Sequence, residues 1–145
     1  MFLFGGNNYN KTITVNDPTN LEEEKIYNPL FSLNLRTWTW SVQKTRSAPG
    51  VIVKPRDEHT AVVDEELSLM IIFGGFIEGE RTNEIAIYDM KQNKWSVVEQ
   101  NESDKKPCPR SGHSAVFHQA KRQMYIFGGK DSNSIKLNDL WVFDF

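Results

Sequence analysis

The sequence predicts an all-β protein made of repeated four-stranded antiparallel sheets, and three observations support this fold class. Two stretches of the chain read almost alike, PRDEHTAVVDEELSLMIIFGG at residues 55–75 and PRSGHSAVFHQAKRQMYIFGG at residues 109–129. Short runs of β-branched and aromatic residues alternate with turn residues, as is typical of β-strands. No segment of about ten or more residues has a clean helical periodicity.

The repeat has a fixed spacing, because Pro109 lies 54 positions after Pro55 and ten residues of the two stretches are identical at this offset. Eight of these identities pair Pro55, Arg56, His59, Ala61, Val62, Phe73, Gly74 and Gly75 with Pro109, Arg110, His113, Ala115, Val116, Phe127, Gly128 and Gly129. Beyond the glycines, IYDMKQNKW (87–95) resembles SLNLRTWTW (32–40), and LWVFDF (140–145) resembles IAIYDM (85–90). MFLFGG at the start resembles MIIFGG (70–75). Self-similarity at such a period indicates a repeat architecture.

One complete repeat therefore lies between two partial ones. Residues 55–108 form the complete unit, residues 1–54 lack the PRxxH part, and residues 109–145 stop before a counterpart of Trp95. The complete unit is expected to have strands at His59–Val63, Leu69–Phe73, Glu84–Met90 and Trp95–Glu99. Four antiparallel strands repeated at about fifty residues define the blade of a β-propeller. Residues 7–29 are a long loop insertion in the first unit.

Composition and charge narrow the class of protein. With 17 basic and 19 acidic residues among 145, the net charge is −2, so nothing favours a nucleic-acid or membrane partner. Cys108 is the single cysteine, which excludes an internal disulfide and favours a reducing compartment, so we expect a cytoplasmic protein. No apolar run approaches the roughly 18 residues of a membrane span, and MFLFGGNNYN lacks the features of a signal peptide.

Three glycine pairs recur, each directly after an apolar run that ends in Phe. They are Gly5-Gly6, Gly74-Gly75 and Gly128-Gly129. Glycine permits positive φ angles and the close approach of another backbone, as a tight turn at the end of a blade requires. Phosphate-binding loops are not indicated, because neither G-x-G-x-x-G nor G-x-x-x-x-G-K-[ST] occurs and no helix is expected to follow.

The glycine pair, the aromatic residue and the tryptophan of the complete unit, Gly74-Gly75, Tyr88 and Trp95, resemble the hallmarks of the kelch repeat. PRSGH (109–113) and LNDLWVFD (137–144) are similar to the kelch subtype of stand-alone and multidomain proteins, and less so to the subtype fused to BTB domains. The chain departs from the pattern in the long segment 7–29, which includes LEEEK, and at Asp57-Glu58, which replace the Ser-Gly of PRSGH.

The resemblance implies a propeller ring, commonly of about six blades, of which this chain supplies fewer than three. We expect further blades to come from the rest of its own protein, from another copy or from a larger assembly. A blade buries both faces of its sheet against neighbours, and exposed apolar faces and unpaired edges favour association. We therefore predict that the chain alone is not a stable monomer.

Candidate catalytic and metal-binding residues are few. His59 and His113 begin the innermost strands, where the kelch resemblance implies a structural role, and no third ligand recurs with them. Cys108 lies beside prolines in a loop rather than in the Cys–Tyr arrangement of kelch-like copper oxidases. The E-x-x-x-D-x-x-x-H iron motif of kelch-type specifier proteins is missing. The tryptophans at positions 38, 40, 95 and 141 are expected to pack between blades. We expect no enzyme activity, no metal and no cofactor.

The remaining candidate is a surface at one rim of the blades. In antiparallel blades the residues before the first strand and those after the glycine pair share a rim, where kelch propellers bind partners. These residues are Asn7, Asn8, Arg56, Asp57, Phe76, Ile77, Arg110, Ser111, Lys130 and Asp131. Arg56 and Arg110 can fork onto a partner's carboxylate or phosphate, or form structural bonds to neighbouring blades. The sequence leaves both interpretations open.

We therefore predict a non-catalytic protein–protein interaction or scaffold module that binds other proteins through its rim loops. The alternative is the propeller region of a multidomain enzyme or of a ubiquitin-ligase adaptor, for example a kelch-containing phosphatase. The two differ outside this sequence, so the full-length protein separates them. Turnover by this segment alone would refute the scaffold interpretation.

Overall fold

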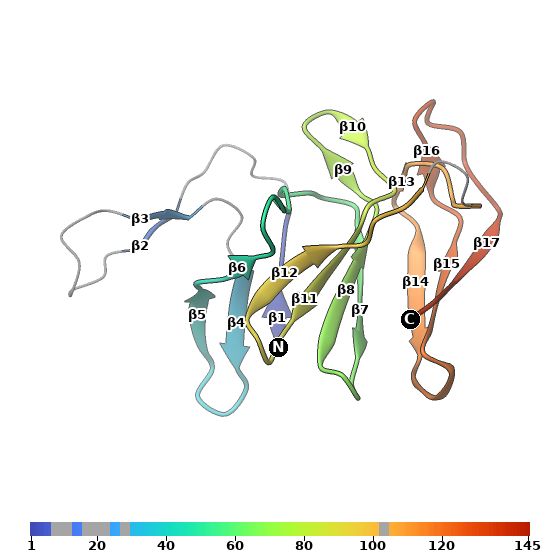
Figure 1. Cartoon of the computed structure of the whole chain (residues 1–145). Coiled ribbons are helices and arrows are strands. Elements are labelled where there is room, and N and C mark those ends of the chain that lie inside the picture. Colours follow the sequence, from blue (N-terminus) through green and yellow to red (C-terminus); the bar gives the residue numbers. More distant parts are fainter. Residues whose placement is uncertain (7–12, 16–23, 27–29, 102–104) are drawn as a thin grey trace.

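The computed structural model describes residues 1–6, 13–15, 24–26, 30–101 and 105–145. Three antiparallel sheets stand side by side like the blades of a fan, and we call them blades 1, 2 and 3 in chain order (Figure 1). The described residues contain no α-helix, only a 3₁₀ turn, η1, at Gln119–Lys121. Accordingly, this part of the chain has no helix of the length and apolarity that crossing a membrane requires. The predicted all-β class of propeller blades is confirmed.

Blade 2 contains all four strands of the repeat. In sheet order they are β7 (Thr60–Asp64), β8 (Leu69–Phe73), β11 (Ile85–Asp89) and β12 (Lys94–Val97). Each lies within one or two residues of its predicted bounds, the usual uncertainty at the ends of an element. A fifth strand, β6 (Arg46–Ser47), runs parallel to β12, and the amide of Ala48 donates to the carbonyl of Trp95 at 3.0 Å. The linker from blade 1 thus covers the outer edge of blade 2.

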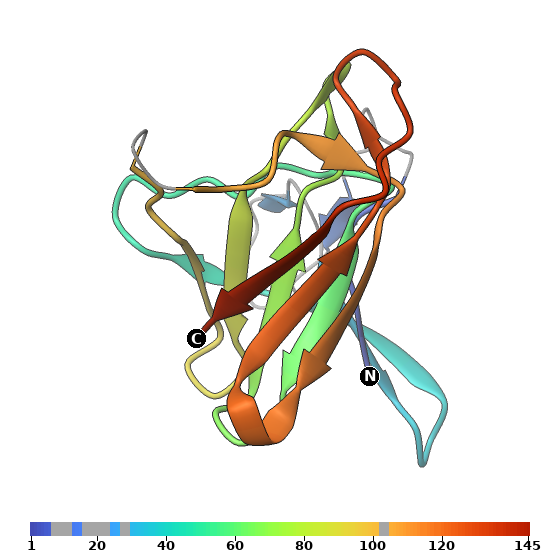
Figure 2. The same cartoon turned by 90° about the vertical axis from the view of Figure 1, so that its right-hand side faces the viewer.

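Blades 1 and 3 each contribute three strands. Blade 1 consists of β1 (Phe2–Leu3), β4 (Leu30–Asn34) and β5 (Thr39–Gln43), the counterparts of β8, β11 and β12. Blade 3 consists of β14 (Ser114–His118), β15 (Gln123–Phe127) and β17 (Leu140–Asp144), the counterparts of β7, β8 and β11. In Figure 2 the orange and red strands of blade 3 lie in front of the green strands of blade 2. Blade 2 is therefore the middle layer of three.

The insertion at residues 7–29 contains a small hairpin of its own. Strand β2 (Ile13–Val15) pairs antiparallel with β3 (Glu24–Ile26), with Ile13 opposite Ile26. The hairpin lies beside blade 1 and outside the three blade sheets (Figure 1). The expected loop insertion therefore includes one pair of strands, and its other residues lie outside the described part of the chain.

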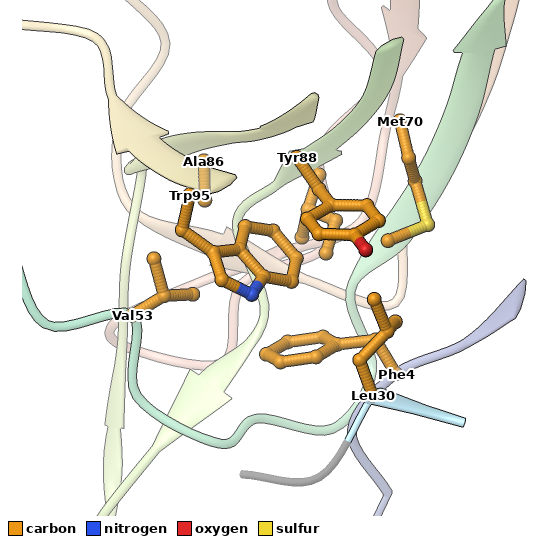
Figure 3. Packing of buried hydrophobic residues seen from close by; sticks show 8 residues of the cluster. Phe4, Leu30, Val53, Met70, Ala86, Tyr88 and Trp95 are labelled. Atoms are coloured by element: carbon orange, nitrogen blue, oxygen red, sulfur yellow. The ribbon is translucent and has the colours of Figure 1, made fainter. Parts of the chain in front are cut away.

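Two apolar clusters join the blades. One lies between blades 1 and 2 and contains Phe4, Leu30, Val53, Met70, Ile72, Ala86, Tyr88 and Trp95 (Figure 3). The other lies between blades 2 and 3 and contains Val62, Ile71, Phe73, Ile85, Met124 and Ile126. Successive residues of a strand point to opposite faces. Strand β8 therefore sends Met70 and Ile72 to one cluster and Ile71 and Phe73 to the other, which explains its unbroken apolar sequence.

Aromatic rings form the centre of the first cluster. The Trp95 ring lies 5.0 Å from both the Phe4 and the Tyr88 ring centroids, and Figure 3 shows the three side chains turned toward one another. Trp141 packs against the second cluster. Trp38 does not pack between blades, because it lies in the β4–β5 turn with a φ of 56° and is 74% exposed. Trp40, in β5, is 51% exposed and belongs to neither cluster. The expectation that all four tryptophans pack between blades is therefore wrong for Trp38 and Trp40.

The middle glycine pair sits where segments of two blades cross. Gly75 has a φ of 103°, and its amide donates to the Arg110 carbonyl of blade 3 at 2.9 Å. A Cβ on Gly75 would lie 2.7 Å from the Asp57 carbonyl oxygen, and one on Gly74 would lie 2.7 Å from the Arg110 carbonyl oxygen. Both the positive φ and the close backbone approach expected from the sequence are present.

Candidate functional site

The predicted rim residues that the structure describes lie at one end of the blades, where β9, β10, β13 and β16 are found at the top of Figure 1. Strand β13 (Arg110–Ser111) pairs antiparallel with β16 (Lys130–Asp131). In blade 2, Asp57 forms the corresponding bridge with Phe76, and β9 (Phe76–Ile77) continues into β10 (Glu80–Arg81). The segment before the first strand of a blade therefore pairs with the segment after its glycine pair. We call this first segment the lead segment; it comprises residues 55–59 in blade 2 and residues 109–113 in blade 3. Asn7 and Asn8, the other two predicted rim residues, lie outside the described residues.

Arg56 and Arg110 belong to the interior of the rim, since both side chains are 0% exposed. Arg110 donates to both carboxylate oxygens of Asp139, at 2.7 and 2.8 Å, and to the Gly128 carbonyl at 3.0 Å. Arg56 makes the matching bonds to Glu84 and to the Gly74 carbonyl. A guanidinium group committed in this way is not available to a partner. Of the two interpretations left open by the sequence, the structural one describes these arginines, although their side-chain bonds remain within their own blade.

The Arg110–Asp139 pair is strongly charge-assisted. Its bidentate geometry raises the pKa of Arg110 and holds the pKa of Asp139 at about 2, because each charge stabilises the other. The indole nitrogen of Trp141 also donates to Asp139, at 2.6 Å. The lead segment of blade 3 is thus tied to the start of β17, which fixes the base of the rim.

Ser111 links the lead segments of blades 2 and 3. Its hydroxyl donates to Glu58 Oε2 at 2.7 Å and accepts from Arg81 Nε at 2.9 Å, and the residue is buried. Glu58 has a φ of 50°, where the equivalent Gly112 has 64°. A glutamate in this left-handed conformation is uncommon. The replacement of Ser-Gly by Asp-Glu in blade 2 therefore supplies a carboxylate that connects two blades.

His59 and His113 line the same end of the molecule. The Nε2 atom of His113 lies 2.8 Å from Thr60 Oγ1, and the Nδ1 atoms of both histidines are buried without a partner among the described residues. Burial and the nearby Arg110 lower the pKa of His113 to about 4, and burial together with Arg56 lowers that of His59. Both rings are neutral at neutral pH. The described residues contain no group of three His, Cys, Asp or Glu side chains placed to hold a metal ion.

A hollow opens between the two lead segments at this rim, with a volume of about 570 Å³. Its walls are formed by Glu58, His59, Gly112, His113, Gly129, Lys130, Lys136 and Leu137. Sequence reasoning identified Lys130 but missed Lys136 and Leu137, which lie after the turn that follows β16. The signal that was available is their position in the segment that follows the glycine pair, which we had placed at the rim.

A second hollow, of about 470 Å³, lies on the hairpin of blade 2 and includes Ile77, Glu78 and Glu80. Here Lys54 is neutralised by Glu78 at 2.6 Å, and the Arg81 guanidinium lies 5.4 Å from the centre of the Phe76 ring. The rim hairpin of blade 2 thus has its cations paired within the chain.

A four-stranded blade between two three-stranded ones, glycine pairs, and Pro-Arg segments with buried arginines that meet at a rim define an incomplete β-propeller. A family model described as the KLHDC2/KLHL20/DRC7 Kelch-repeats domain matches residues 1–145. The chain belongs to the kelch-repeat family, as its sequence motifs predicted.

Several curated proteins are similar to the chain. The leucine-zipper-like transcriptional regulator 1 homolog of Drosophila melanogaster is 32% identical over 126 residues, 83% of this chain and 12% of that protein. The Rho GTPase-activating protein gacHH of Dictyostelium discoideum is 29% identical over 150 residues, 97% of this chain and 8% of that protein. Human host cell factor 2 is 32% identical over 136 residues, 88% of this chain and 16% of that protein. The chain therefore spans a small part of the length of each of these relatives.

Proposed function

We propose that this chain is a non-catalytic scaffold module that binds another protein at the rim formed by β9, β10, β13 and β16. One observation carries the proposal: the polar groups of the rim fall into two sets. Arg56, Arg110 and Ser111 are buried and bonded within the chain. Around them, the exposed side chains of Glu78, Lys130 and their neighbours line open hollows. A rigid base with exposed polar and apolar side chains above it is the form of a recognition surface.

The proposal includes where the chain works and what it needs. It acts in the cytoplasm, without a cofactor, and binds no nucleic acid or membrane, in agreement with its net charge of −2. It belongs to the kelch subtype of stand-alone and multidomain proteins. Its outer blades contact further blades of the same protein, of another copy or of a larger assembly. Support comes from exposed apolar residues on both outer sheets, including Leu3 in blade 1 and Leu140 in blade 3.

The second candidate is a propeller region attached to an enzyme or to a ubiquitin-ligase adaptor. The specific observation in its favour is that one relative is a Rho GTPase-activating protein, of which the matched part covers 8%. In that case the chain still binds through its rim, and catalysis resides elsewhere in the longer protein.

Site-specific photocrosslinking tests the rim. A photoreactive residue is placed at Ile77 or Lys136 on the rim and, as matched controls, at Lys91 or Lys121 in the exposed turns at the opposite end of the blades. We expect partner crosslinks from the rim positions only, and their loss on competition with the unmodified chain. Crosslinks from the opposite end alone, or measurable turnover by the chain itself, would contradict the proposal.

A further inference from the structure

We propose that the hollow between the lead segments binds an acidic segment of the partner protein, whose carboxylates lie against Lys130 and Lys136. This inference rests on the proposed rim function and adds the chemistry of the partner. The hollow is lined by both lysines, by Leu137 and by the backbone of Gly112 and Gly129.

The two lysines are held together by the backbone. Lys130 and Lys136 face each other in an antiparallel bridge, and both are exposed. Like charges directly opposite each other in a β-pair repel, which costs stability. An anion between them would relieve that repulsion, so the position is one that a negatively charged ligand stabilises.

The acidic groups of the same region are engaged elsewhere. Asp131 accepts the amides of Asn133 and Ile135, at 3.0 and 2.8 Å. Asp139 is bound to Arg110 by both oxygens, and Glu58 accepts the hydroxyl of Ser111. Within the described part of the chain neither Lys130 nor Lys136 makes an ion pair. On blade 2, by contrast, the rim lysine Lys54 is paired with Glu78.

Glu58 makes the distribution of charge around the hollow uneven. It belongs to the lead segment of blade 2 and lines the hollow together with the lysines of blade 3. The wall on the Glu58 side repels a carboxylate, whereas the wall at Lys130 and Lys136 attracts one. An acidic segment is therefore expected to place its carboxylates over blade 3, and Glu58 fixes its orientation more than it adds affinity.

A carboxylate fits the site better than a phosphate. The cations that face the hollow are two lysines, which act as point charges. The guanidinium groups of Arg56 and Arg110, whose planar shape suits phosphate, are buried in ion pairs. The chain as a whole carries a net charge of −2, which disfavours the polyanionic backbone of a nucleic acid.

The test uses the full chain and three fluorescein-labelled probes: hexaglutamate, hexalysine and a single-stranded oligonucleotide. Fluorescence anisotropy at low salt should show binding of hexaglutamate in preference to the other two, and weaker binding as salt is added. The double variant K130E/K136E should bind hexaglutamate about tenfold more weakly, as expected for the loss of two partly exposed ion pairs and the gain of repulsion. The double variant K91E/K121E has the same change in net charge at the opposite end and should lose less than about twofold.

Glu58→Gln provides a gain of affinity. The amide oxygen still accepts from Ser111, but the negative wall is removed, so hexaglutamate should bind about twofold more tightly. Far-UV circular dichroism of every variant checks that the blades remain folded. Equal losses in both lysine double variants, no preference for hexaglutamate over hexalysine, or tighter binding of the oligonucleotide would overturn the inference. If rim crosslinking persists while these results fail, the scaffold function stands and only the acidic partner is rejected.

Discussion

Blades 2 and 3 carry the same residue types at equivalent positions, yet the two blades bury them very differently. Val62 is 8% exposed and its equivalent Val116 is 60% exposed. Phe73 is 0% exposed, whereas Phe127 is 51% exposed. Blade 2 is covered on one face by blade 1 and on the other by blade 3, whereas no described residue covers the outer face of blade 3, which we call its bare face. The comparison teaches that an apolar run in this repeat encodes a blade interface, whether or not a neighbour is present to complete it.

The bare face has a cost that grows with its area. Burial of apolar surface is worth about 25 cal/mol per Å², and large exposed apolar patches usually mark interaction sites. Residues Val116, Phe127, Leu140 and Val142 form the face. Substitutions at matched positions of the two blades can therefore measure how much of the stability of a blade comes from its neighbour.

The largest expected effect is that of Phe73→Ala. The Phe73 ring lies between blades 2 and 3, 5.0 Å from His113 and 5.7 Å from Phe143, and its removal should lower the free energy of unfolding by about 3–5 kcal/mol. The matched change Phe127→Ala should cost less than about 1 kcal/mol. Urea denaturation of the full chain at low protein concentration measures both. Equal losses would mean that Phe127 is covered in solution.

Arg110→Ala should lower the free energy of unfolding by about 3 kcal/mol, because Asp139 loses its charged bidentate partner and the Gly128 carbonyl loses its side-chain donor. Arg56→Ala removes a pair that lacks the bidentate geometry and should cost less. Arg110→Lys serves as the control, since it keeps the charge but loses the fork. A stability of Arg110→Lys equal to that of the parent chain would contradict the importance of the bidentate bond.

His113 makes stability depend on pH. Its pKa is about 4 in the folded chain, below the ordinary value of 6.5, so the unfolded chain takes up the proton first as the pH falls. Above pH 6.5 His113 is neutral in both the folded and the unfolded chain and does not lower the free energy of unfolding. Between pH 6.5 and 4 the free energy of unfolding falls progressively, by roughly 2 to 3 kcal/mol, because the unfolded chain binds the proton more tightly. His59, whose pKa is also lowered, contributes in the same direction.

His113→Gln is the variant that isolates this dependence. Its free energy of unfolding, measured by urea denaturation at several pH values, should fall less steeply over the same window. An unchanged slope would assign the pH dependence to other groups.

Gly75→Ala compares the glycine pairs of blades 1 and 2. A Cβ at Gly75 meets the Asp57 carbonyl at 2.7 Å, whereas one at Gly6 meets no described atom within 4 Å. Both positions have a positive φ, so Gly6→Ala should cost roughly 1 kcal/mol and Gly75→Ala roughly 2 to 3 kcal/mol. Thermal unfolding of the two variants checks the difference. Equal shifts would show that φ alone sets the requirement for glycine.

The smallest effect on stability is expected for serine substitutions on the bare face of blade 3. Val116→Ser, Leu140→Ser and Val142→Ser should each change the free energy of unfolding by less than about 0.5 kcal/mol. Combined, they should reduce apolar dye binding and self-association, which fluorescence and ultracentrifugation measure. Unchanged dye binding in the triple variant, or a large loss of stability, would show that this face is not the exposed interface.

The site was predictable from sequence only in part. Antiparallel topology was enough to bring Arg110 and Ser111 beside Lys130 and Asp131, because strand direction alone decides which segments share a rim. It did not decide which of them are exposed. Burial depends on neighbouring side chains, so Arg110 and Ser111 proved to be interior residues and Lys136 and Leu137 proved to line the hollow.

What the sequence by itself determined is local or periodic. The apolar runs, the glycine pairs and the 54-residue spacing set the strands, the tight turns and the blade repeat, since each depends on backbone preferences and on the alternation of faces. Tertiary structure alone decided which side chains are exposed and which residues they contact. Glu58 meets Ser111 from a position 53 residues away, Trp38 points to solvent, and Lys130 faces Lys136. Each outcome depends on how one blade packs on the next or on how the rim hairpins fold, and backbone preferences do not encode either.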